Sequence, residues 1–135
     1  MNPGLRDLYE AARKARENSH SPYSGHKVGA ALRTADGKVH AGCNVENSSY
    51  GATVCAERGA IQAAVASQGR FVLKELLVLT DVNPPWPPCG LCRQVISEFA
   101  DPDLMIHAIN LNGDTYSIAF KDLVPQAFTP AHLGK

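Results

Sequence analysis

The chain has 135 residues, with 13 lysines and arginines against 13 aspartates and glutamates, so its formal net charge is zero. This balance argues against a polybasic nucleic-acid clamp and against binding to anionic membranes. Hydrophobic residues make up 44%, which excludes wholesale disorder, and the length fits one domain over 1–135. No apolar run approaches the ~20 residues of a membrane span, and the N-terminus lacks a secretory apolar region. We therefore expect a cytoplasmic protein.

The first half of the chain contains signals for two helices and three strands. Apolar residues at helical spacing predict a helix over 4–17. Short apolar runs on both sides of the Asp36–Gly37 turn predict strands over 28–32 and 39–45. An alanine-rich helix over 55–66, which Gly69 ends, precedes a continuous apolar strand over 73–79.

The second half begins with a proline-rich loop over 83–88, which can be neither a helix nor an inner strand. A helix over 91–99 and a strand over 104–109 follow it. The Asn112–Gly113 signal predicts a hairpin with a strand over 115–119, and a short helix and tail are expected from Leu123 to the end. This order predicts an α/β fold, a three-layer sandwich around a five-stranded mixed sheet.

Four cysteines, Cys43, Cys55, Cys89 and Cys92, are not expected to form disulfides in a reducing compartment. Cys89 and Cys92 are three residues apart at a helix start, so their sulfurs lie on one face. Cys55 begins another predicted helix. Three thiolates leave the fourth tetrahedral position of Zn²⁺ open, which is typical of a catalytic zinc site.

The charge of such a site requires a cationic residue nearby. Helix N-termini stabilise thiolates, but three of them on Zn²⁺ leave a formal charge of −1. Arg58, next to Glu57, is placed to offset that charge by donating a hydrogen bond to sulfur. Two alternatives stay open at this point: a structural zinc with Cys43 as the fourth ligand, and a thioredoxin-like redox pair. The redox motif would follow a first strand, whereas this one follows a late loop.

Three motifs carry a family resemblance: Cys-Ala-Glu-Arg at 55–58, Pro-Cys-Gly-Leu-Cys-Arg-Gln at 88–94 and Gly-Cys-Asn-Val-Glu-Asn at 42–47. With Pro22-Tyr23-Ser24 and the apolar run over 28–32, the chain resembles the small zinc-dependent cytidine deaminases from its first helix to about residue 128. The resemblance implies a cytidine deaminase-like fold. It also implies hydrolysis of cytidine and deoxycytidine to uridine and deoxyuridine plus ammonia, in pyrimidine salvage.

The resemblance assigns roles to the residues of these motifs. Cys55, Cys89 and Cys92 would bind zinc, with a water at the open position. Glu57 would carry a proton from that water to N3 and then to the departing ammonia. The backbone of Ala56 would help hold the pyrimidine. The alternative for Glu57 is an ordinary glutamate in the first turn of a helix, and its position between Cys55 and Arg58 argues against that.

Asn44 and Glu46 follow a predicted strand and, by resemblance, hydrogen-bond the ribose 3′-hydroxyl. Residues at i and i+2 point to the same side of an extended segment, so they can receive one sugar together. The alternative is turn chemistry after the strand. The family pattern keeps Arg93 and Gln94, but the sequence gives them no chemistry.

The chain departs from the family pattern at two places. His26 stands where the family usually has a phenylalanine stacked over the pyrimidine, and the loop before Pro88 is richer in proline. Histidine is smaller, keeps some stacking ability and adds two polar nitrogens. We therefore expect that the chain accepts 4-substituted cytosine nucleosides more readily. Alternatively, His26 points into solvent and another side chain stacks.

By resemblance the chain also forms a homotetramer, in which Phe128 reaches the pyrimidine of a neighbouring subunit. The alternative is that Phe128 is a core residue of its own subunit. The expected binding partner is a nucleoside substrate. Binding to nucleic acid or to a membrane is not expected. Competing functions are a deaminase of a modified aminonucleoside such as blasticidin S, a polynucleotide-editing deaminase, and a zinc module without catalysis. The editing branch generally has histidine as its first zinc ligand, where this chain has Cys55.

Overall fold

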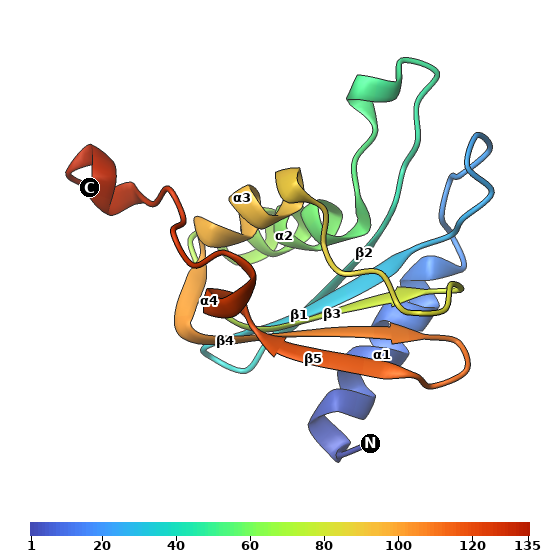
Figure 1. The fold of residues 1–135 in the computed structure, drawn as a ribbon, viewed down its shortest axis with the longest axis horizontal. Coiled ribbons are helices and arrows are strands. Elements are labelled where there is room, and N and C mark those ends of the chain that lie inside the picture. The colour runs from blue at the N-terminus through green and yellow to red at the C-terminus, as the bar shows by residue number, and fades with distance from the viewer.

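The computed structural model describes all 135 residues, which form a five-stranded mixed sheet between two layers of helices (Figure 1). The strand order is β2-β1-β3-β4-β5. Only β3 and β4 are parallel, and all other neighbours are antiparallel. The strands are β1 (Gly29–Thr34), β2 (Val39–Cys43), β3 (Leu73–Thr80), β4 (Ala100–Asn110) and β5 (Thr115–Ala119). The predicted α/β sandwich with its mixed sheet is confirmed.

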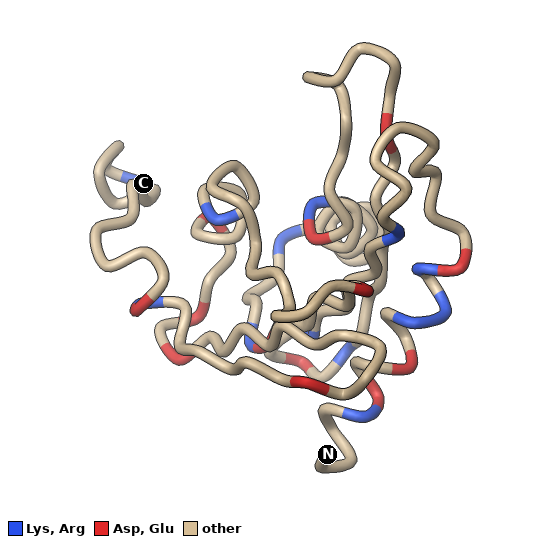
Figure 2. The backbone as a smooth tube through the Cα atoms, turned by 45° about the vertical axis from the view of Figure 1, so that its right-hand side comes forward, with Lys and Arg blue, Asp and Glu red and all other residues tan.

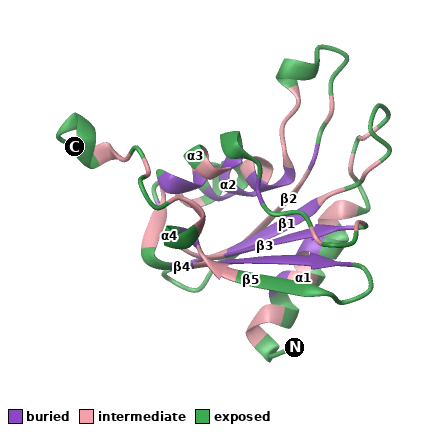
Figure 3. Cartoon of the chain, viewed as in Figure 1, coloured by how far each residue is buried: buried purple, intermediate pink, exposed green.

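The helices divide between the two faces of the sheet, and one apolar core lies on each face. Helix α1 (Pro3–Arg16) covers one face, where Leu8 and Ala12 pack in a cluster with Leu77 and Leu79 of β3. Helices α2 (Ala56–Gln68) and α3 (Gly90–Ser97) cover the other face and a larger core. Burial is concentrated where the sheet meets these helices (Figure 3). Ala56 in the first turn of α2 and Cys92 in the first turn of α3 are fully buried in this larger core.

Local sequence explains where the helices begin, where they end and how closely they pack. Asn2 caps α1, since its side chain accepts a hydrogen bond of 2.8 Å from the backbone N–H of Leu5. Gly69 ends α2 with φ 72°, as predicted from its position. Gly42 lets β2 lie directly against α2, because a Cβ there would be 2.4 Å from the Ala60 nitrogen.

Several boundaries differ by one to four residues from the sequence-based expectations, and the end of β2 is one that bears on the site. The strand predicted over 39–45 ends at Cys43, and Val45 only bridges His20 and Val54 because the chain leaves the sheet there. Beyond this point the chain forms a protruding loop, which contains a 3₁₀ turn at Tyr50–Ala52 (Figure 1).

The C-terminal helix is shorter and earlier than predicted. It spans α4 (Phe120–Leu123), so it ends at the residue where we expected it to begin. Pro125 cannot donate the backbone hydrogen bond that a longer helix needs. The remaining residues form a tail with a 3₁₀ turn at Pro130–Leu133, and this tail extends away from the sheet (Figure 1).

Charged residues of both signs are interspersed along the chain, most visibly along α1 (Figure 2). The pattern agrees with the zero net charge of the sequence. None of the helices combines the length and the apolar character that crossing a membrane requires.

Candidate active site

The two cysteine motifs meet where α2 and α3 begin on the same face of the sheet. Cys55 is the residue before α2, Cys89 is the residue before α3, and Cys92 lies in the first turn of α3. Their three sulfur atoms all lie within 4.8 Å of one another. Cys43 is not part of this cluster. The structure therefore brings together the three predicted ligands and gives no support to Cys43 as a fourth.

The cluster fits a zinc ion in both distance and donor chemistry. Sulfurs bound tetrahedrally at about 2.3 Å from Zn²⁺ stand about 3.8 Å apart, so only small side-chain movements separate this cluster from a ligand set. Thiolate sulfur is a preferred zinc donor, and three donors leave one coordination position for a water or substrate. Cys89 is exposed, Cys55 is half-buried and Cys92 is buried. The site is thus anchored on one side and accessible on the other.

Arg58 supplies positive charge beside the sulfurs, as predicted. Its Nη2 donates hydrogen bonds to Cys55 Sγ at 3.4 Å and to the Thr53 carbonyl at 3.2 Å. The pKa of Cys55 is lowered to about 5, because the Cys92 thiol donates a hydrogen bond to its sulfur and Arg58 adds further stabilisation. The pKa of Cys92 is raised by the same shared proton and by burial. Arg58 Nε is buried and has no hydrogen-bond partner, so this N–H group of the guanidinium is not paired with a protein acceptor.

Glu57 lies in the first turn of α2, next to the cysteine cluster. It is 5% exposed, so its carboxyl group is almost completely withdrawn from water. Burial raises the pKa of Glu57 to about 7. A carboxyl group with this pKa can both accept and release a proton near neutral pH. This is the behaviour expected of a proton-transfer group.

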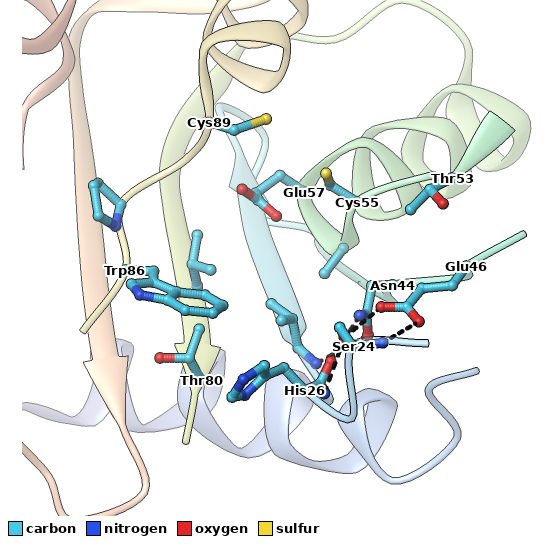
Figure 4. A pocket seen from close by; sticks show the side chains of 14 residues that line it. Ser24, His26, Asn44, Glu46, Thr53, Cys55, Glu57, Thr80, Trp86 and Cys89 are labelled. Atoms are coloured by element: carbon cyan, nitrogen blue, oxygen red, sulfur yellow. Dashed lines mark hydrogen bonds between the residues drawn. The ribbon is translucent and has the colours of Figure 1, made fainter. Parts of the chain in front are cut away.

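A cavity of about 270 Å³ opens beside Glu57 and the exposed side of the cluster (Figure 4). Figure 4 shows Glu57, Cys55 and Cys89 at one end, Asn44 and Glu46 on one side, and Trp86, Thr80 and His26 on the other. Of the site residues that we predicted from the sequence, the lining contains seven: His26, Asn44, Glu46, Cys55, Ala56, Glu57 and Cys89. The cavity volume of about 270 Å³ is close to the lower end of the usual range for small-molecule sites.

Asn44 and Glu46 line the cavity and also hold the loop over 19–28 in place. Asn44 Oδ1 accepts a hydrogen bond from the Val28 N–H at 2.9 Å, and Asn44 Nδ2 donates to the His26 carbonyl at 2.9 Å. Glu46 Oε1 accepts from the backbone N–H groups of Tyr23 and Ser24. A hydrogen bond from the Ser24 hydroxyl lowers the pKa of Glu46. The two side chains therefore have the turn role that the sequence left as one alternative, and they also line the cavity. Their contact with a ribose hydroxyl stays a prediction.

Of the two aromatic residues predicted to contact the base, His26 lines the cavity of its own chain and Phe128 does not. His26 lines the cavity while its side chain is 42% exposed. Phe128 is 55% exposed, so the alternative that it is a core residue of its own subunit is wrong. It stacks on His132 in the tail, with ring centroids 5.2 Å apart, and does not line the cavity of its own chain.

Sequence reasoning missed Trp86, Thr80 and Pro87 as lining residues. Trp86 and Pro87 lie in the loop that leads directly into Cys89, so their place in the chain was a usable signal. Thr80 ends β3, and nothing in its local sequence distinguished it from a strand residue.

Comparisons with known proteins agree with this geometry. Residues 4–108 match the family described as the cytidine and deoxycytidylate deaminase zinc-binding region. The chain is 46% identical over 122 residues to a cytidine deaminase of Halalkalibacterium halodurans, covering 90% of this chain and 92% of that protein. It is 44% identical over 126 residues to one of Sporosarcina psychrophila, covering 93% and 92%. The crystal structure of a Burkholderia pseudomallei cytidine deaminase has a TM-score of 0.86 at 45% identity, covering 95% of this chain and 100% of that one.

The fold and the cysteine cluster together define a zinc-binding α/β protein. With the matches over most of its length, the chain belongs to the cytidine deaminase family.

Proposed function

We propose that the chain is a cytidine deaminase, which hydrolyses cytidine and deoxycytidine to uridine and deoxyuridine and releases ammonia. One observation carries the proposal: three cysteine sulfurs lie within 4.8 Å of one another, and two of these cysteines, Cys55 and Cys89, line a cavity of about 270 Å³ together with the buried Glu57. The test is an assay for ammonia release from cytidine, deoxycytidine, cytosine, CMP and blasticidin S. Preference for the first two supports the proposal, whereas preference for blasticidin S supports the modified-aminonucleoside alternative.

In this mechanism, Cys55, Cys89 and Cys92 hold the zinc. When bound, zinc supplies the Lewis acidity that lowers the pKa of water toward ~7. Arg58 offsets the negative charge of the thiolates through its hydrogen bond to Cys55. The cysteines fix the reaction centre at the end of the cavity where Glu57 lies.

Glu57 moves the protons of the reaction. It takes a proton from the attacking water and delivers it to N3 of the pyrimidine as the oxygen bonds to C4. It then takes the second proton, from the hydroxyl now on C4, and transfers it to the exocyclic nitrogen. The C4–N bond breaks, ammonia leaves, and C4=O forms. The position of Glu57 at the start of α2, beside Cys55, supports this role because the carboxyl group shares the cavity with the cluster.

Asn44, Glu46 and the backbone of Ala56 bind the substrate. Asn44 Nδ2 has one further proton to donate beyond its bond to His26, and the Glu46 carboxylate has lone pairs left to accept. A sugar hydroxyl can therefore join both side chains without displacing the contacts that hold the loop. The backbone of Ala56 faces the pyrimidine at the start of α2.

His26 widens the range of accepted bases. Its imidazole is smaller than a phenyl ring and lines the cavity, so a substituent on the 4-amino nitrogen finds more room or a polar partner. We extend the proposed substrate class to cytosine nucleosides that carry such a substituent.

The active form is a homotetramer in which Phe128 covers the cavity of a neighbouring subunit. The tail extends away from the sheet (Figure 1), and the Phe128 side chain is more than half exposed in the single chain. Sedimentation should give a tetramer, and Phe128→Ala should raise KM for cytidine. A fully active monomer contradicts this assembly. The four unpaired cysteines suit a reducing compartment, and the cytoplasm is one.

A further inference from the structure

One side of the cavity is an aromatic corner made by His26 and Trp86. Their ring centroids are 5.1 Å apart and their planes are inclined at 63°, an edge-to-face arrangement. Both side chains line the cavity, opposite Asn44 and Glu46 (Figure 4). A flat pyrimidine that reaches from the sugar contacts to Glu57 must therefore pass this corner.

Asp81, at the end of β3, holds the imidazole in this position. Its Oδ1 lies 3.1 Å from His26 Nδ1. A carboxylate only accepts hydrogen bonds, so Nδ1 carries the proton and donates it. The bond thus fixes both the orientation of the ring and the identity of its protonated nitrogen.

Asp81 and His26 are in turn fixed by their neighbours. Arg16 Nη2 lies 3.8 Å from Asp81 Oδ2, and Arg16 Nε donates to the Lys27 carbonyl at 2.9 Å. The backbone of His26 is held on both sides, by the bond from Asn44 Nδ2 and by a bond to Ser24 Oγ at 3.0 Å. The imidazole is therefore the only part of this residue that depends on Asp81.

Asp81 itself does not line the cavity. We propose that Asp81 is a positioning residue: it holds the His26 imidazole against Trp86, and the corner so formed is the surface on which the pyrimidine base binds. The inference rests on the proposed function and extends it to residues outside the zinc centre. Trp86 thus contacts the base, and Asp81 acts on the base through the orientation of His26.

The first test compares the kinetics of three variants on cytidine. Asp81→Ala releases the imidazole and should raise KM about 3- to 10-fold, the effect of losing one hydrogen bond, with kcat within about twofold of wild type. Asp81→Asn keeps an oxygen acceptor for Nδ1 and should restore KM to within about twofold. Asp103→Asn removes an exposed carboxylate on β4 and controls for the loss of charge.

The second test uses the fact that Trp86 is the single tryptophan of the chain. Its emission reports on the corner without interference from other indoles. Titration with uridine, which cannot be deaminated, should change the emission of the wild type until the site saturates. Asp81→Ala should need about 3- to 10-fold more uridine, whereas Asp81→Asn and Asp103→Asn should follow the wild type.

The outcomes separate this inference from the proposed function. Unchanged KM and an unchanged uridine titration in Asp81→Ala overturn the positioning role. So does a lower melting temperature with no change in either binding measure, because that result makes Asp81 merely structural. If the wild type releases no ammonia from cytidine, the proposed function fails, and the uridine titrations alone then decide the role of Asp81.

Discussion

The two ends of the cavity are built in different ways. At the zinc end, the functional groups stand at the starts of α2 and α3, and Ala60 and Ile96 of the same helices are fully buried in the core. At the other end, His26, Asn44, Glu46 and Trp86 come from segments outside the regular elements. Hydrogen bonds between loops hold the first three, and Trp86 packs edge-to-face against His26. Groups that carry out the chemistry thus share the rigidity of the core, while groups that select the substrate depend on contacts that a single substitution can change.

The most severe test of the zinc end is to remove one of its ligands. Cys92→Ala should abolish zinc binding and activity and destabilise the fold, because metal binding and folding are coupled at such sites. Zinc content per chain, thermal melting and ammonia release measure the three effects. Cys43→Ala is the control and should keep one zinc per chain. An active Cys92→Ala protein with full zinc would contradict the assignment.

Glu57→Gln, at the same end of the cavity, tests whether catalytic activity can be lost while the fold and the zinc content are kept. The change removes the proton carrier but no zinc ligand, so the fold and the zinc content should persist. The value of kcat should fall by roughly 10²- to 10⁴-fold, the usual contribution of a general acid–base group. Glu98→Gln, an exposed glutamate at the end of α3, should be neutral. Activity within about tenfold of wild type would mean that another group carries the proton.

Gly42→Ala tests whether the packing of α2 supports the zinc end. The new Cβ would lie 2.4 Å from the Ala60 nitrogen and 2.9 Å from the Ala56 carbonyl oxygen, so α2 must shift. We expect a loss of about 1–3 kcal/mol in the free energy of unfolding, as for overpacked cores, and a lower kcat. Gly51→Ala has no atom within 4 Å of its Cβ and is the matched control. Urea denaturation with equal stability for both variants would refute the packing argument.

Glu46→Ala tests the other end of the cavity. It removes a partner of the sugar and an acceptor for the backbone of Tyr23 and Ser24. We expect KM for cytidine to rise about tenfold, with a smaller change in kcat, since the lost hydrogen bonds act on binding. Glu98→Ala serves as the control. Steady-state kinetics identical to wild type would place the sugar elsewhere.

The smallest effect is expected from His26→Phe, a change confined to the selecting side. The larger ring should reduce kcat/KM for an N4-acylcytidine relative to cytidine by a few-fold, while cytidine itself remains a substrate. The ratio of the two kcat/KM values is the quantity to measure. An unchanged ratio means that His26 does not set the range of 4-substituents.

The zinc end could be predicted because its signals are local. Cys89 and Cys92 fall three residues apart at a helix start, so their sulfurs lie on one face whatever the rest of the chain does. Glu57 is only two positions after Cys55 in the chain, and its role came from the family resemblance of the motif over 55–58. For Trp86 the one local signal was its place in the loop before Cys89, and Asp81 had none. Their roles depend on contacts with His26, which is more than fifty residues away in the chain, and no periodicity records such contacts.

The sequence by itself determined the α/β class, the mixed sheet, the helix starts and the three cysteines, because hydrophobic periodicity and capping act over a few neighbouring residues. Only the tertiary structure decided that Cys55 meets a pair of cysteines more than thirty residues away, and that Cys43 stays apart from them. It also decided the surroundings of His26, with Asp81 on one nitrogen and Trp86 against its ring. Contacts between distant segments follow from how the layers pack, and packing is a property of the whole chain.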